Sequence, residues 1–227
     1  MSYVIAIDGP SGVGKSSVAR AVGQRIGFLN VDSGALYRIM TWQCLLHQVD
    51  TSCPEAVAEF SESVEIECVP EAGQISYRVN GISPGNAIRT PEINRAASPV
   101  ATVKEVRERI TGWLKALTRF GNLIVEGRDI TTAVFPDSPA RFYLDASAEA
   151  RAQRRQLEEV QKGIANQSME DVKNSLLARD QIDSTRQHAP LRKADGVYLI
   201  DSTQLTLAEV IEIVVEALPA AWREKRQ

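Results

Sequence analysis

The residues with the clearest chemistry form one glycine-rich run near the start of the chain. The run matches G-x-x-x-x-G-K-[ST], the pattern of a loop whose backbone N–H groups cradle phosphates at the positive end of a helix. Its lysine supplies a cation for the β- and γ-phosphates, and the hydroxyl that follows the lysine is a ligand for Mg²⁺. The sequence therefore predicts a nucleoside triphosphate site at Gly9, Pro10, Ser11, Gly12, Val13, Gly14, Lys15, Ser16 and Ser17.

The segments on either side of this run are those that a phosphate loop requires. Val4–Ile7 is a short apolar run, as expected of a buried parallel strand. Val18, Val22 and Ile26 recur at i, i+4 and i+8 and predict one face of a helix, which Gly27 can end. An ordinary glycine-rich turn would not explain the lysine, so this context favours a phosphate site.

Charged residues follow another apolar run, Leu123–Val125. Loops after parallel strands face the ligand crevice, and a carboxylate in that place of a phosphate-loop protein serves Mg²⁺ or its waters. Glu126 and Asp129 both qualify, and the sequence does not distinguish between them. Arg128, between them, is placed to bind a second anion.

A similar group follows the apolar run 28–31. Asp32 or Ser33 is suited to cap the next helix, which is a sufficient structural role. The same position also faces the ligand crevice, so Tyr37 and Arg38, one turn into that helix, are candidates for ligand contact.

Arginines gather in the second half of the chain. Arg179, Asp183 and Arg186 are spaced i, i+4 and i+7, on one face of a predicted helix. Arg107 lies at the edge of the apolar stripe of another helix, where it is either a snorkelling residue or a donor into the cleft. An exposed ion pair would contribute little, but so many arginines in an acidic protein indicate polyphosphate chemistry. Three more stand one helix earlier: Arg151, Arg154 and Arg155.

Composition excludes several classes of protein. The chain has 227 residues, a net charge of -3, 44% hydrophobic and 24% charged residues, which is typical of a globular protein and unlike a broad nucleic-acid binder. Cys44, Cys53 and Cys68 form no C-x-x-C pair and indicate reduced thiols. No apolar run is long enough to span a bilayer, and no signal peptide is evident. We expect a cytoplasmic protein without membrane or nucleic-acid polymer partners.

The elements that must position these residues alternate between strand and helix, which predicts an α/β fold with a parallel five-stranded sheet flanked by helices. The expected strands are Val4–Ile7, Phe28–Val31, Leu123–Val125, Arg141–Leu144 and Val197–Ile200. The expected helices cover 15–26, 33–47, 100–119, 147–162, 168–186 and 206–217.

Two regions interrupt this alternation. Between about Pro54 and Pro91, a short helical stretch precedes the period-two segments 64–69 and 75–79, which predict an antiparallel hairpin in a substrate-covering insert. The polar, arginine-rich region of about 160–190 is a candidate lid that closes over both substrates and excludes water.

With these residues assembled, the chain resembles the bacterial cytidylate kinases, which are nucleoside monophosphate kinases. The resemblance covers nearly the whole chain and rests on GPSGVGKSS, DSGALYR, RTPEINRAAS, VEGRDITTAVFP, FYLDASAEARAQRR and RDQIDSTRQHAPL, in that order. It implies a monomer that converts ATP and CMP, or dCMP, to ADP and the diphosphate with Mg²⁺. It also implies a P-loop core over 1–35 and 95–227 and a monophosphate-binding region over 36–94.

The resemblance implies a role for each matching residue. Lys15, Arg128, Arg179 and Arg186 would be catalytic, and Arg154, with Arg151 and Arg155, would line the ATP side or the lid. Ser16 would ligate Mg²⁺, with Asp32 acting through water. The implied acceptor site comprises Ser33, Arg107 and Asp129 at the cytosine edge, Arg38, Arg128 and Arg186 at the phosphate, Ser98, Arg179 and Asp183 near the ribose, and Tyr37 and Gly127.

One segment departs from the family pattern G-R-D-I-G-T-V-V-F-P. Thr131 replaces the glycine, and Ala133 replaces a valine. If the glycine has positive φ, threonine would be strained there, so we expect a different path for this loop.

Other functions fit the residues less well. A regulatory GTPase would carry N-K-x-D, which is absent from the sequence, and a nucleic-acid motor would be longer and more basic. The nearest alternative is a kinase for another small acceptor such as AMP, UMP or a non-nucleotide metabolite. From the residues alone, the prediction stops at a P-loop phosphotransferase with an arginine-rich acceptor site.

Overall fold

Parallel β-strands form the centre of the fold. The computed structural model describes residues 2–161 and 168–223. All five predicted strands are present and parallel; β1, β5 and β6 are slightly longer than expected, and β2 and β7 are shifted by one residue. They are β1 (Val4–Asp8), β2 (Leu29–Asp32), β5 (Leu123–Gly127), β6 (Ala140–Asp145) and β7 (Tyr198–Asp201).

The predicted hairpin is also present, but it extends the same sheet. β3 (Glu67–Glu71) and β4 (Gln74–Arg78) pair antiparallel, and β4 pairs with β2 at Asn30 and Gln74. The sheet therefore has seven strands in the order β3-β4-β2-β5-β1-β6-β7, and the expectation of five was wrong. The cause is the free edge of β2, where the Asn30 N–H donates to the Gly73 carbonyl of the hairpin turn at 3.0 Å.

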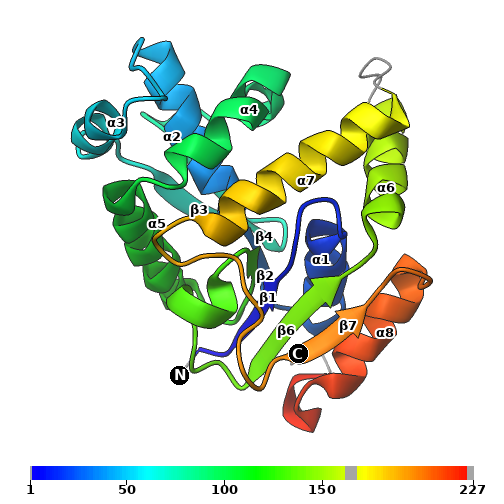
Figure 1. The fold of residues 1–227 in the computed structure, drawn as a ribbon. Helices are drawn as coiled ribbons and strands as arrows, with labels where there is room; N and C mark the ends of the chain where they lie inside the picture. The colour runs from blue at the N-terminus through cyan, green and yellow to red at the C-terminus, as the bar shows by residue number, and fades with distance from the viewer. Residues whose placement is uncertain (1, 162–167, 224–227) are drawn as a thin grey trace.

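Helices cover both faces of the sheet. α1 (Lys15–Ile26) and α8 (Leu207–Ala217) pack on one face, and α2 (Ser33–Leu46) and α5 (Lys104–Ala116) on the other (Figure 1). Strand side chains alternate between the two cores: Val4 and Ala6 enter one, and Ile5 and Ile7 the other. This alternation explains why β1 is apolar at every position before Asp8.

The predicted helix over 100–119 is α5, which begins four residues later than expected, followed by the short turn Leu117–Phe120. α4 (Pro91–Val100) precedes α5, and the chain turns between them, with the Thr102 hydroxyl donating to the Pro99 carbonyl at 2.7 Å. The prediction missed α4, although Thr90 caps it and a proline stands at its first turn, both ordinary signals of a helix start. Shorter turns lie at Gly85–Arg89, Leu117–Phe120, Ile130–Val134 and Ala220–Trp222.

The remaining helices follow the predictions closely. They are α3 (Pro54–Ser61), α6 (Ala148–Gln161) and α7 (Met169–Thr185). α7 packs on α6 through Ala152, Val172 and Leu176 and passes above the loop between β1 and α1 (Figure 1). Most of the proposed lid is therefore a regular helix; its residues 162–167 lie outside the described part of the chain.

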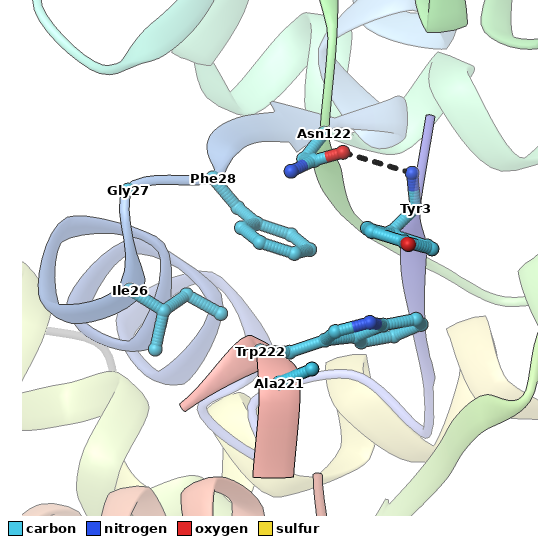
Figure 2. Close-up of a pocket in the computed structure, with 7 residues that line it drawn as sticks. All are labelled: Tyr3, Ile26, Gly27, Phe28, Asn122, Ala221 and Trp222. Atoms are coloured by element: carbon cyan, nitrogen blue, oxygen red, sulfur yellow. Dashed lines mark hydrogen bonds between the residues drawn. The ribbon is translucent and has the colours of Figure 1, made fainter. Parts of the chain in front are cut away.

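An aromatic cluster closes the opposite, amino-terminal edge of the sheet. Figure 2 shows Tyr3, Phe28 and Asn122, which precede β1, β2 and β5, around Trp222 of the C-terminal segment. The ring centroids of Tyr3 and Trp222 are 4.7 Å apart, and Asn122 accepts the Tyr3 N–H at 2.9 Å. The side chains of this cluster line a small cavity. The cavity is separate from the phosphate loop, which lies at the carboxyl ends of the strands.

Within residues 2–161 and 168–223, no helix combines the length and apolar character needed to cross a membrane.

Candidate active site

The phosphate loop leaves β1 in a conformation that requires glycine. Gly9 has φ of 154°, and a Cβ there would lie 2.2 Å from the Leu144 carbonyl oxygen. Lys15 begins α1, and its ammonium donates to the carbonyls of Gly9 and Pro10 at 2.9 and 2.8 Å. Burial, followed by the nearby Arg128, lowers the pKa of Lys15 to about 7. The loop therefore wraps around the Lys15 side chain, whose Nζ donates hydrogen bonds to carbonyl oxygens of the same loop.

Ser16 and Glu126 lie together beneath this loop. The Ser16 hydroxyl donates to Glu126 Oε1 at 2.6 Å. Burial, together with Asp32 opposite it on β2, raises the pKa of Glu126. A hydroxyl and a carboxylate are oxygen ligands suited to Mg²⁺. In the described residues, no group of three or more His, Cys, Asp and Glu side chains could hold a metal alone, so phosphate oxygens would have to complete the site.

Asp32 has other partners. Its Oδ1 accepts the Ala35 N–H at 3.0 Å as a helix cap, and its Oδ2 pairs with Arg38 at 2.7 Å. Arg89, which the sequence did not single out, lies 3.6 Å from the same oxygen. Attraction to Arg38 and Arg89 outweighs burial, so the pKa of Asp32 is lowered. This carboxylate therefore orients arginines, a role that the sequence prediction did not include.

Asp129 lies in a different, buried cluster. It accepts a hydrogen bond from Arg107 and lies 3.6 Å from Arg186, and all three side chains are about 95% buried or more. The Arg107 guanidinium also lies over the Tyr37 ring, 5.5 Å from its centroid. Arg107 is thus a buried hydrogen-bond donor and not a snorkelling residue; its place in a ligand cleft stays a prediction.

Asp183 links the buried cluster around Asp129 to Arg128, which lies near the phosphate loop. It accepts from Arg128 Nε at 2.9 Å and lies 3.6 Å from Arg186. The predicted face of α7 therefore points at the loop after β5, and Arg128 approaches Lys15 closely enough to affect its pKa.

Arg179 is the exception among these arginines. Within residues 2–161 and 168–223 it has no ion-pair partner, and its buried Nε has no hydrogen bond. Burial, followed by repulsion from Arg128, lowers the pKa of Arg179 to about 10. A half-buried guanidinium among other cations, with an Nε that lacks a partner, is an arrangement that an anionic ligand would stabilise.

Ser33 and Gly127 meet where β2 and β5 end. The Ser33 hydroxyl donates to the Glu126 carbonyl at 2.7 Å, and a Cβ on Gly127 would lie 2.5 Å from that hydroxyl oxygen. Only glycine permits this approach. Ser98 is buried on α4, which packs against α2 and α7.

The three arginines of α6 have separate surroundings. Arg154 donates to the Val13 carbonyl at 3.3 Å and to the Ser202 hydroxyl at 2.9 Å, joining the phosphate loop to the segment after β7. Arg155 pairs with Glu159 at 2.8 Å on its own helix. Arg151 is buried and belongs to the contact described next.

Asp180 is a residue that the sequence analysis missed. Its Oδ1 accepts the Ser11 N–H at 2.8 Å, and its Oδ2 pairs with Arg151, which donates to the Ser11 carbonyl at 2.9 Å. This contact fastens the phosphate loop to α6 and α7 together. The only signal for it was the position of Asp180 in the run R-D-Q-I-D, beside two residues that were selected.

We expect Asp180→Ala to raise the KM for ATP about tenfold, because the loop loses a hydrogen bond to a charged acceptor. The KM for CMP should change less, since the acceptor-side ion pairs of α7 remain. Steady-state kinetics measure both constants, with Gln181→Ala on the exposed face as the control. Equal changes in both constants would contradict a specific contact with the loop.

A phosphate loop at the carboxyl edge of a parallel sheet, facing a cluster of buried arginines, defines a P-loop protein of the kinase type. Residues 5–220 match the family described as "Cytidylate kinase", and the chain belongs to this family.

Individual relatives agree with this assignment. A cytidylate kinase of Shouchella clausii (strain KSM-K16) is 38% identical over 222 residues, covering 98% of each chain. A bifunctional pantoate ligase/cytidylate kinase of Prochlorococcus marinus (strain MIT 9313) is 40% identical over 94% of this chain, which spans only 42% of the relative. An uncharacterized protein from Eubacterium ventriosum ATCC 27560 shares the fold, with a TM-score of 0.53, 12% identity and coverage of 95% and 97% of the two chains.

Proposed function

We propose that the chain transfers the γ-phosphoryl group of ATP to CMP or dCMP. One observation carries the proposal: half-buried Arg179, whose buried Nε has no hydrogen bond and which has no ion-pair partner in the described structure, lies next to Arg128, which is itself close to Lys15. This row of cations, from the phosphate loop to α7, suits two polyphosphate substrates placed end to end. The names of the relatives favour CMP over other acceptors.

On the donor side, residues 9–17 would hold the triphosphate of ATP, with Lys15 at its β- and γ-phosphates. Ser16 would ligate Mg²⁺, and of the carboxylates considered, Glu126 is the one in contact with Ser16. The ion would neutralise charge on the phosphates when bound. Arg154 would support the loop through Val13.

On the acceptor side, Arg38, Arg128 and Arg186 would hold the CMP phosphate. Asp129, oriented by Arg107, would accept from the cytosine edge together with Ser33, and Asp183, Arg179 and Ser98 would lie near the ribose. Tyr37 and Gly127 would shape this site. The carboxylates here orient arginines as well as facing the ligand, so the site is organised before CMP binds.

No general base is needed, because the acceptor phosphate is already largely ionised at neutral pH. The protein would catalyse transfer by aligning the two phosphates and by surrounding the transferred group with Lys15 and the arginines. A movement of the region 160–190 that excludes water would suppress transfer to water. We further propose a cytoplasmic monomer that acts without nucleic-acid polymers.

A coupled ADP-release assay with CMP, dCMP, UMP, AMP and GMP tests this function. We expect kcat/KM for CMP and dCMP to exceed that for AMP and GMP by at least about 100-fold, because a site that hydrogen-bonds one base edge rejects bases that leave its groups unpaired. Faster turnover of AMP or UMP than of CMP would overturn the assignment of the acceptor.

A further inference from the structure

The carboxylate of Asp8 receives three hydrogen bonds from the turn that follows β5. The backbone N–H groups of Ile130 and Thr131 donate to Oδ1 and Oδ2 at 2.9 and 2.7 Å. The Thr131 hydroxyl also donates to Oδ2, at 2.6 Å. Asp8 and Thr131 are both fully buried, so these bonds are shielded from water. The contact spans more than 120 residues of sequence.

Asp8 is fixed by the sheet. It is the last residue of β1, in register with Gly127 on β5 and Tyr143 on β6, and the next residue, Gly9, begins the phosphate loop. Gly9 packs directly against the Leu144 carbonyl. The carboxylate therefore has a defined position relative to the phosphate loop.

The segment that Asp8 holds carries acceptor-side residues. We call residues 127–131 the acceptor loop. It contains Arg128, which pairs with Asp183, and Asp129, which pairs with Arg107. A small displacement of this loop would move both side chains relative to the phosphate loop, and transfer between two substrates is sensitive to errors of about 1 Å.

Threonine at position 131 is not strained, because the positive φ on which that expectation depended is not present. The described non-glycine residues with positive φ are Gln48, Ala72, Asn80 and Ala189, so Thr131 does not require glycine-like geometry. Its side chain instead adds the third hydrogen bond to Asp8. A glycine there would leave only the two backbone donors.

We propose that Asp8 and Thr131 form a positioning pair that holds the acceptor loop in place relative to the phosphate loop, a role that rests on the proposed function. The hydroxyl of Thr131 keeps the ionised carboxylate in place. Neither residue touches a substrate in this proposal; both act through Arg128 and Asp129.

Protonation of Asp8 opposes this arrangement. Burial raises the pKa of Asp8 to about 6, the hydrogen bonds from Thr131 lower it, and Asp129 raises it further. The other ionisable groups that interact with Asp8 are Lys15 on α1 and Tyr143 on β6. A proton on Oδ2 would face the backbone N–H and the hydroxyl of Thr131, which are both donors to that oxygen. The contact between Asp8 and Thr131 should therefore weaken as the pH falls below about 6.

The same raised pKa affects stability in the opposite direction. Because the folded pKa lies above the ordinary value of 3.8, the contribution of Asp8 to stability is fully present below about pH 4 and is lost as the pH rises through about 6. Activity and stability should therefore respond to this group with opposite signs, which separates a positioning role from a structural one.

The test compares Thr131→Val, which removes only the hydroxyl, with Thr131→Ser, which keeps it. In Thr131→Val we expect the acidic limb of the plot of kcat against pH to shift to higher pH by about one unit. A shift of this size corresponds to the loss of one hydrogen bond to a charged acceptor. At pH 6 this shift lowers kcat about fivefold. Thr131→Ser should restore the wild-type limb.

A direct measurement separates the pair from the enzyme reaction. Carbon-13 NMR of the carboxyl groups should show a higher pKa for Asp8 in Thr131→Val than in the wild type or Thr131→Ser. This readout holds even if CMP is not the acceptor, so it distinguishes failure of the pair from failure of the proposed function. The control is Thr132→Val, because the Thr132 hydroxyl is buried without a hydrogen bond and should change neither readout.

Two results would overturn the proposal. One is an unchanged Asp8 pKa in Thr131→Val. The other is an unchanged acidic limb in both Thr131→Val and Asp8→Asn, since the asparagine has a single acceptor oxygen and its NH2 group would face at least one of the three donors. Thermal unfolding of each variant establishes that the protein measured is folded.

Discussion

Arg179→Met should lower kcat for CMP phosphorylation about 1,000-fold while leaving the free energy of unfolding unchanged or slightly higher. A guanidinium that stabilises charge in phosphoryl transfer contributes about 10³-fold or more. Its removal breaks no ion pair in the described structure and relieves repulsion from Arg128. Steady-state kinetics and chemical denaturation measure the two quantities.

Arg128→Met is the matched comparison. It should lower kcat as well, but among the described residues it also leaves the mostly buried Asp183 carboxylate with only the longer ion-pair contact to Arg186, 3.6 Å away. We expect a loss of about 2 kcal/mol in the free energy of unfolding from this unpaired charge. A kcat for Arg179→Met within tenfold of the wild type would remove Arg179 from the reaction. A loss of stability equal to that of Arg128→Met would show that Arg179 has a structural partner.

The phosphate loop and the five central strands could be predicted from the sequence because their signals are local. The apolar run of β1, the glycines and the start of α1 follow one another within 26 residues. The position of the hairpin could not be predicted, because the pairing of Asn30 with Gln74 depends on which strand edge remains free. Period-two patterns indicate a strand but not its neighbour.

In the candidate site, too, local signals in the sequence identified residues but not the partners that they contact. The sequence placed both Glu126 and Asp129 after the apolar run 123–125 but could not choose between them, because the choice depends on how the chain turns after Gly127. In the structure that turn leaves Glu126 against Ser16 and directs Asp129 to Arg107. Asp180 was missed because its partner, Ser11, is 169 residues away in sequence.

Sequence reasoning placed Asp129 and Asp183 against the ligand, and gave Asp32 the role of a helix cap or of a carboxylate that acts on Mg²⁺ through water. In the structure, Asp32, Asp129 and Asp183 each hold an arginine. Such pairs keep the guanidinium groups in place before an anion binds, which reduces the reorganisation that binding would otherwise require. A single carboxylate thus has a positioning role that its position in the sequence does not reveal.

Lys15→Met should lower kcat/KM for ATP about 10,000-fold, since the loop loses its only side-chain cation for the β- and γ-phosphates. The pKa of Lys15 adds a second, more specific consequence. Burial lowers this pKa to about 7, so near pH 7.5 much of the free protein carries a neutral amine. A phosphate beside the amine favours the charged form, so binding of ATP should take up a proton.

Calorimetry in buffers of different ionisation enthalpy measures this proton uptake. We expect the uptake to be largest between about pH 7 and 9, to decline below pH 6, where Lys15 is already charged, and to disappear in Lys15→Met. Arg25→Met, which changes an exposed cation at the far end of the same helix, should retain it. Equal uptake in the wild type and Lys15→Met would mean that another group accepts the proton and that the Lys15 ammonium is already charged within the loop. The pH dependence of ATP binding thus reports whether the lysine exchanges the carbonyls of Gly9 and Pro10 for phosphate oxygens.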